Sequence, residues 1–182
     1  FATADEKLNA VSMETGEPLW SEKLAGAVID TMTAVVTPAA VYIATTKGMV
    51  YSFNLKGREN WKFNAGAGVF ETPMLVNNRI LVSGSDGRLH SLAAQSGKEQ
   101  WAVDVGAKFR LAFQRGTLYA VSYYGSVSAL EMEKGAELWK KELADTFVTA
   151  PLVFENRMVV AGMKGAVTWL NLDNGSVIAK KA

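Results

Sequence analysis

A repeat of about 40 residues constrains the fold of this chain more than any other feature of its sequence. The pattern Gly-x-x-x-Trp occurs four times, and successive tryptophans are 41, 40 and 38 residues apart. The four copies are Gly16/Trp20, Gly57/Trp61, Gly97/Trp101 and Gly135/Trp139. A fifth copy begins at Gly175, but Ala179 stands in place of its tryptophan. A fixed period in this size range indicates a repeat architecture, in which one unit cannot bury its own apolar face.

A second series of glycines keeps the same period. Its members are 39, 38 and 40 residues apart, and each precedes a short apolar-rich run. They are Gly48, Gly87, Gly125 and Gly165, and Glu6 takes the matching place in the first copy. Two independent series with one period leave little room for coincidence.

Within one period the residues favour strands over helices. Residues 69–108 are rich in β-branched and aromatic side chains and are interrupted by Gly, Asn and Asp, which favour turns. They predict strands at 72–76, 79–83, 88–94 and 98–105, with turns at Asn77-Asn78, 84–87 and 95–97. Glycine suits such turns because a positive φ is costly for a residue with a Cβ atom.

Four strands in each period predict an all-β fold made of four-stranded antiparallel blades. Such a blade has two apolar faces and must stack on neighbours to bury both, as the blades of a β-propeller do. We expect the tryptophans and the glycines of Gly-x-x-x-Trp to dock neighbouring blades, since one buried Trp covers about 150–250 Å². The expected units are a half-blade at 6–24 and full blades at about 28–64, 69–105, 109–143 and 147–181. These make eighteen strands, or about four and a half blades, a count that closes no ring neatly. We expect a piece of a larger ring, with a four-bladed ring plus an extra hairpin, or a dimer that completes the circle, as the alternatives.

Several segments resemble a known repeat family. Residues 86–92, 96–101 and 13–20 resemble the repeat of pyrroloquinoline-quinone-type (PQQ-like) propellers. The blade at 149–175, with its missing docking tryptophan and the ending 177–181, is similar to a late blade of the BamB family. Members of that family are outer-membrane β-barrel assembly lipoproteins with an eight-bladed propeller.

The resemblance implies a non-catalytic scaffold of the bacterial periplasm, held at the outer membrane by a lipid anchor that this sequence lacks. Its implied partner is the periplasmic part of the barrel-forming subunit, bound by loops that join successive blades. In the family one such loop carries acidic residues ahead of Thr-Pro. Here Thr72-Pro73 is present, but glycine and phenylalanine stand in place of the acids, so those family residues have no counterpart. Open blade edges also predict some self-association.

Composition excludes several other classes of protein. The 182 residues are 49% apolar and 20% charged, with a net charge of +1 and no cysteine. An apolar content this high excludes a disordered chain, and near-neutral charge without basic runs argues against nucleic acid. No apolar run approaches the ~18–20 residues that span a bilayer. The absence of cysteine fits an oxidising compartment slightly better than the cytosol.

The sequence offers no catalytic, cofactor-binding or metal-binding set. His90 is the only histidine, which excludes triads and multi-histidine metal sites, and strand packing explains it. Acids such as Glu14, Asp86, Glu99 and Asp173 fall in turns or at strand ends. We therefore expect no enzyme activity and no cofactor. Two alternatives stay open: a segment of a quinone-dependent dehydrogenase whose cofactor residues lie elsewhere, and a ligand-sensing propeller of a receptor.

The segments that join successive blades carry the remaining signal. Each has an apolar or aromatic residue, and the loops between second and third strands should open at the same end of the blades. Aromatic residues beside arginine are typical of protein-binding hot spots. The predicted docking face consists of Phe70, Phe109, Arg110, Tyr123, Tyr124 and Phe147. The competing interpretation is that these side chains fill the central channel.

Overall fold

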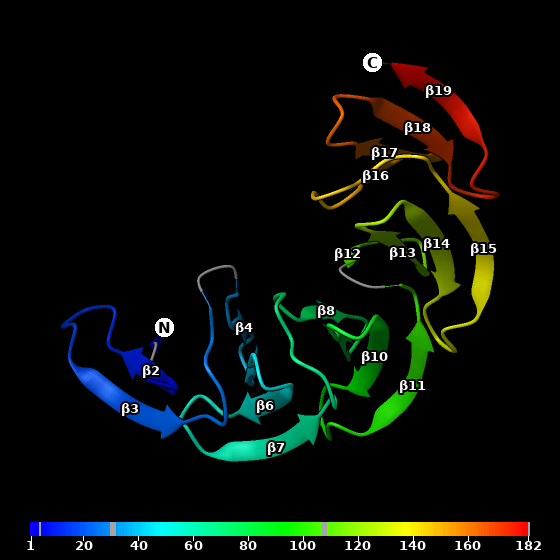
Figure 1. Ribbon diagram of the computed structural model, residues 1–182. Helices are drawn as coiled ribbons and strands as arrows, with labels where there is room; N and C mark the ends of the chain where they lie inside the picture. The colour runs from blue at the N-terminus through cyan, green and yellow to red at the C-terminus, as the bar shows by residue number, and fades with distance from the viewer. Residues whose placement is uncertain (4, 30–31, 107–108, 182) are drawn as a thin grey trace. The chain divides into compact units, whose positions relative to one another are not determined.

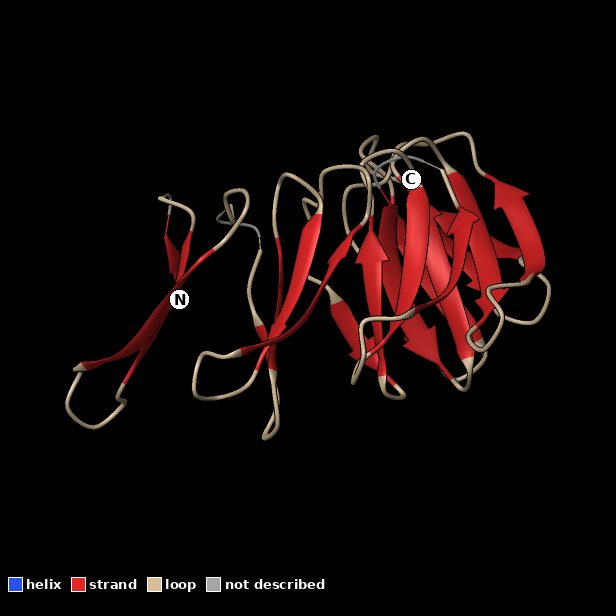
Figure 2. Cartoon of the chain, turned by 90° about the horizontal axis from the view of Figure 1, so that it is seen from below, coloured by secondary structure: helices blue, strands red, loops and turns tan. Residues whose placement is uncertain are grey.

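The computed structural model describes residues 1–3, 5–29, 32–106 and 109–181. Over these residues the protein is all-β, with nineteen strands in five antiparallel sheets and no helix (Figures 1 and 2). Four of the sheets have four strands, as predicted for propeller blades, and one has three. A search of these ranges finds no helix able to cross a membrane. The chain forms two compact units, Phe1–Gln100 and Trp101–Ala182.

The first unit contains two complete sheets and most of a third. In each sheet the strands are hydrogen-bonded in chain order. The first sheet comprises β1 (Ala2–Thr3), β2 (Lys7–Val11) and β3 (Pro18–Lys23). The second comprises β4 (Val35–Val36), β5 (Val41–Ala44), β6 (Met49–Phe53) and β7 (Glu59–Asn64). The third comprises β8 (Met74–Val76), β9 (Arg79–Ser83), β10 (Arg88–Ala93) and β11 (Glu99–Asp104).

The second unit begins within β11 and contains the last two sheets. The fourth sheet comprises β12 (Phe109–Gln114), β13 (Thr117–Ser122), β14 (Ser126–Glu131) and β15 (Glu137–Glu142). The fifth comprises β16 (Leu152–Phe154), β17 (Arg157–Ala161), β18 (Val167–Asn171) and β19 (Val177–Lys181). In both sheets the fourth strand meets the third at a β-bulge next to the turn that joins them.

The expected strands agree closely with those observed, with one correction. The strand predicted at 79–83 is β9, and the other three of that blade differ from the structure by one or two residues at their ends. The first sheet was expected to have two strands and has three, because Ala2–Thr3 pairs with Lys7 and Leu8. A two-residue strand at a chain end has no alternation from which it could be predicted. Residues 30–31, within the range predicted for the second blade, lie outside the described part.

The second glycine series occupies turns with left-handed backbone. In the turn between β5 and β6, Gly48 has a φ of 82° and its N–H donates to the Thr45 carbonyl at 2.9 Å. Glu6 has a φ of 62° in the corresponding turn of the first sheet, which confirms the match between Glu6 and the glycines. This backbone region is unfavourable for a residue with a side chain. The Glu6 carboxylate binds the Lys47 ammonium at 3.0 Å and accepts a hydrogen bond from the backbone at Gly26.

Apolar side chains fill the space between successive sheets. In the first unit, Tyr42, Val50 and Trp61 of the second sheet pack with Ile80 and Val82 of the third. In the second unit, the cluster between the fourth and fifth sheets includes Tyr119, Val127, Met158 and Leu170. The cluster residues that belong to strands alternate along each strand, so they line one face of a sheet.

Candidate functional site

The docking tryptophans bind the next sheet along the chain. Each lies on the last strand of its sheet and donates its Nε1–H to a backbone carbonyl in a turn 31 to 35 residues later. That turn, here called the docking turn, joins the third and fourth strands of the following sheet. The acceptors are Leu55 for Trp20 (2.9 Å), Ala94 for Trp61 (2.9 Å), Met132 for Trp101 (3.0 Å) and Leu172 for Trp139 (2.8 Å).

A glycine of the same docking turn lies directly beneath each indole. A Cβ atom on Gly97 would come within 2.5 Å of the Trp61 ring, and one on Gly175 within 2.5 Å of Trp139. Gly57 meets Trp20 and Gly135 meets Trp101 in the same way. A Cβ atom on Gly16 would have nothing within 4 Å among the described residues. The glycine and the tryptophan of one Gly-x-x-x-Trp copy therefore contact two different neighbours, which spacing alone does not reveal.

The fifth sheet has a tryptophan on the face that carries the docking tryptophans in the other sheets, but it lies on the third strand, β18, and not on the fourth. In the second and fourth sheets, paired residues across the last three strands read Tyr42–Ser52–Trp61 and Tyr119–Ala129–Trp139. In the fifth sheet the same row reads Val159–Trp169–Ala179. Trp169 is only partly buried, and β19 is exposed along its whole length.

The single histidine has a packing role, as predicted. His90 is buried on β10 against Phe63, with the two rings edge to face at 5.6 Å between centroids. Its Nδ1 lies 2.7 Å from the Glu99 carboxylate. Its Nε2 is buried and has no hydrogen-bond partner among the described atoms. Over the described ranges no three His, Cys, Asp or Glu side chains gather in a way that could hold a metal ion.

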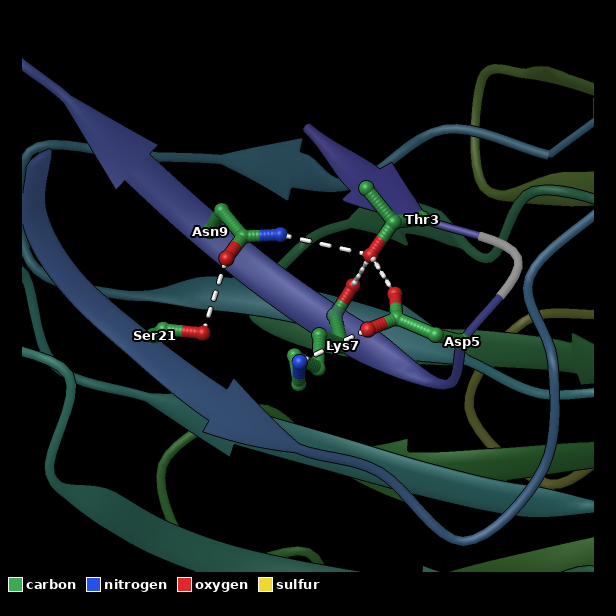
Figure 3. Close-up of polar contacts among 5 residues, drawn as sticks. All are labelled: Thr3, Asp5, Lys7, Asn9 and Ser21. Atoms are coloured by element: carbon green, nitrogen blue, oxygen red, sulfur yellow. Dashed lines mark hydrogen bonds and ion pairs between the residues drawn. The ribbon is translucent and has the colours of Figure 1, made fainter.

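A polar network covers the outward side of the first sheet (Figure 3). Ser21 of β3 donates to the Asn9 Oδ1 at 2.7 Å, and the Asn9 amide donates to Thr3 at 3.4 Å. Thr3 donates to Asp5, whose carboxylate lies 2.7 Å from the Lys7 ammonium. The hydrogen bond from Lys7, followed by that from Thr3, lowers the pKa of Asp5 below its usual value. The bond from Lys47 lowers the pKa of Glu6 in the same way.

The turns between second and third strands lie at the same end of the sheets as the segments that join one sheet to the next, here called crossovers. In the second unit, the Phe147 N–H donates to the Tyr123 carbonyl at 3.1 Å, and the Met163 N–H donates to Thr146 at 2.8 Å. In the first unit, Thr46 donates to Ala27 and Ser85 to Gly68. Within each unit, this shared end of turns and crossovers, here called the rim, was predicted from the sequence.

The six predicted docking residues have different surroundings. Phe109 is 1% exposed and Phe147 is 3% exposed, so neither offers surface to a partner, and their place in an exposed face is corrected. Tyr124 is 66% exposed, Phe70 is about half exposed, and Tyr123 and Arg110 are partly buried. Tyr123 and Tyr124 meet edge to face, with centroids 5.1 Å apart. Phe70 belongs to the first unit and the other five residues to the second.

Two exposed residues at the rim of the second unit were not predicted from the sequence. Val148 follows Phe147 in the crossover, and Met163 lies in the turn between β17 and β18. Both are about half exposed or more. A methionine such as Met163 fits a core as well as a surface, so its exposure could not be predicted from the sequence. Together with Tyr124 they form what we call the rim patch (Tyr124, Val148 and Met163).

Comparison with known proteins gives a consistent family match. The family described as "Outer membrane protein assembly factor BamB" matches residues 4–111 and 85–178. A protein of that name from Moranella endobia is 27% identical over 111 residues, which are 60% of this chain and 29% of the relative. This chain thus matches less than a third of that relative's length.

Solved structures show the same fold. The crystal structure of BamB from Moraxella catarrhalis superposes with a TM-score of 0.84 at 21% identity, covering 100% of this chain and 60% of the other. A europium-containing methanol dehydrogenase superposes with a TM-score of 0.76 at 12% identity, covering 96% of this chain and 47% of the other. At these identities the structures establish the β-propeller fold alone.

Proposed function

The chain belongs to the BamB family of outer membrane protein assembly factors, and on that premise we propose that it is a non-catalytic protein-binding scaffold of the bacterial periplasm. It acts at the outer membrane, in the assembly of β-barrel proteins. Its partner is the periplasmic part of the barrel-forming subunit. The partner and the location are those that the family suggests, and the binding surface is suggested by the geometry of the rim.

The rim patch is the observation that supports a binding surface. Backbone hydrogen bonds join the turn at Tyr123 to the crossover at Phe147, and the crossover at Thr146 to the turn at Met163. These hydrogen bonds hold three segments of backbone side by side, and each segment carries one exposed apolar side chain. Because the backbone of the rim patch is already ordered, little conformational entropy is lost there when a partner binds, which favours affinity. Aromatic residues and methionine are enriched at protein interfaces.

The test is binding of purified periplasmic domains of the barrel-assembly subunit to the immobilised chain. Replacing Met163, 61% exposed, by Glu places a charge in the rim patch, and Tyr124→Ala removes its only aromatic ring. We expect each variant to weaken binding by about tenfold or more, as hot-spot truncations do. The melting temperature should stay within a few degrees of the parent, because exposed side chains contribute little to stability.

A matched control sits at the far end of the same sheets. Leu138 is 57% exposed near the start of β15, next to the docking turn and away from the rim. Leu138→Glu should leave binding unchanged. Phe109→Ala should lower stability by about 3–5 kcal/mol, since it empties a core site. Equal binding by Met163→Glu and the parent chain would refute the rim patch as the docking surface.

A further inference from the structure

The docking turn of the fifth sheet contains a sequence that is chemically reactive. It joins β18 to β19 and includes Asn174-Gly175, the only asparagine in the chain that is followed by glycine. Asn174 is exposed to solvent, whereas Gly175 lies beneath the Trp139 indole with a φ of +67°. The corresponding positions in the other docking turns are Thr15, Lys56, Ser96 and Lys134, which have no side-chain amide.

One hydrogen bond of the turn favours nucleophilic attack on the Asn174 side-chain amide. The Ser176 N–H donates to the Asn174 Oδ1 at 2.9 Å, which polarises the side-chain carbonyl. The same N–H would stabilise the negative charge that develops on Oδ1 when a nucleophile adds to the carbon. Gly175 has no side chain to hinder its backbone nitrogen, and its N–H must release a 2.9 Å hydrogen bond to the Asn171 carbonyl before that nitrogen can attack. We infer that Asn174 is a site of spontaneous deamidation in the folded protein.

The reaction needs only water and base. The Gly175 nitrogen loses its proton to hydroxide and attacks Cγ of Asn174, forming a C–N bond and a tetrahedral oxyanion at Oδ1. The C–N bond to the side-chain amino group then breaks, and the group leaves as ammonia after protonation by water. Water opens the resulting five-membered succinimide at either carbonyl. The products are aspartate and isoaspartate, the second with one extra carbon in the backbone.

Three other asparagines provide an internal comparison. Asn54, Asn64 and Asn171 each accept the same bond from the backbone two residues on, at 2.8 to 2.9 Å. They are followed by Leu55, Ala65 and Leu172, which all carry a Cβ atom. The carbonyl is polarised in all four turns, so the reactivity of Asn174 depends on the glycine that follows it.

Isoaspartate at this position alters the contact between the fourth and fifth sheets. The Leu172 carbonyl accepts the Trp139 indole N–H at 2.8 Å, and Gly175 packs against the same ring. An additional backbone atom between residues 174 and 175 changes the span of the turn that holds both groups. We expect the modified protein to lose the hydrogen bond and the ring contact that hold Trp139 in place.

The experiment is ageing of the folded chain in mildly alkaline buffer, followed by intact mass and peptide mapping that separates aspartate from isoaspartate. We expect replacement of NH₂ by OH at Asn174, with both products present, and no change at Asn54, Asn64 or Asn171 over the same interval. Asn174→Gln should abolish the mass gain, because its longer side chain does not form the five-membered ring. Aged parent protein should melt at a lower temperature than fresh protein, and aged Asn174→Gln should not.

A parallel sample in urea separates the native turn from the bare sequence. Deamidation in the folded sample at a rate within tenfold of the unfolded one supports a competent native turn. No deamidation in the folded sample, or equal conversion at Asn54, overturns the inference. Conversion with unchanged melting would retain the modification site and refute its effect on Trp139.

Discussion

At the scale of single residues, the contact between a glycine and an indole explains the repeat. Glycine is required at Gly97 for two separable reasons, its φ of +68° and the Trp61 ring against it. Gly16 has a similar φ of +74° and no neighbour within 4 Å. The two positions therefore separate backbone strain from loss of the docking contact.

Substitution of both glycines by alanine tests this division. Gly16→Ala should cost about 1–2 kcal/mol, the penalty for a left-handed L-residue. Gly97→Ala should cost about 1–3 kcal/mol more, since a Cβ atom displaces the indole from a packed site. Urea unfolding of each variant measures the difference. Equal losses would show that the docking contact contributes nothing beyond the turn itself.

Residue spacing predicted which positions repeat but not which neighbour each one touches. The recurring tryptophans, Trp61 and Trp101 among them, indicated docking between sheets. The sequence did not show, however, that Trp61 packs against Gly97 of the next sheet. Burial of Phe109 and Phe147 was likewise beyond the sequence, because an aromatic residue near a turn serves equally well in a core or on a surface. The packing role of His90 could be predicted because the chain has no second histidine and its strand is mostly apolar.

At the scale of elements, the first and last sheets differ in their outward faces. The first carries the Ser21–Asn9–Thr3 network, whereas the fifth carries Trp169 and the exposed Leu152. Strand positions were predicted well wherever turn residues bounded an apolar run, as in 79–83. β1 was missed because two residues carry no pattern.

The ion pairs of the first sheet predict a response to acid. Asp5 and Glu6 have pKa values below normal because they accept hydrogen bonds from Lys7 and Lys47. A carboxyl with a lowered folded pKa stabilises the fold above its unfolded pKa and loses that effect as the pH falls through its folded pKa. Hydrogen-exchange protection of β1 and β2 should therefore decline below about pH 4.

Charge removal provides the control for this response. Lys7→Gln with Lys47→Gln should reduce the protection of β1 and β2 already at neutral pH and flatten its pH dependence. Lys140→Gln, which removes the partner of Glu142 in the second unit, should leave the first sheet unchanged. A pH profile that is identical in the parent and the double variant would contradict the assignment to Asp5 and Glu6.

At the scale of the whole molecule, the fold is shared with enzymes, so function depends on the site. The chain has no cysteine, and no cluster of three potential metal ligands occurs within its described ranges. If the chain is the scaffold proposed above, pyrroloquinoline quinone added with calcium should give neither a bound-quinone absorbance nor dye-linked dehydrogenase activity. A quinone-dependent methanol dehydrogenase assayed in parallel validates the conditions. Activity in this chain would favour the dehydrogenase alternative over the scaffold.

The staggered contact between tryptophan and glycine has a consequence for how such chains can lengthen or be recombined. A gene segment that encodes one sheet alone supplies a tryptophan without the carbonyl that accepts its N–H. It also supplies a docking turn without the tryptophan ring that packs on its glycine. The exchangeable module instead runs from the Trp61 strand to the Gly97 turn, straddling two sheets. Grafts cut in the crossovers should therefore succeed only when the incoming turn offers glycine to the resident tryptophan.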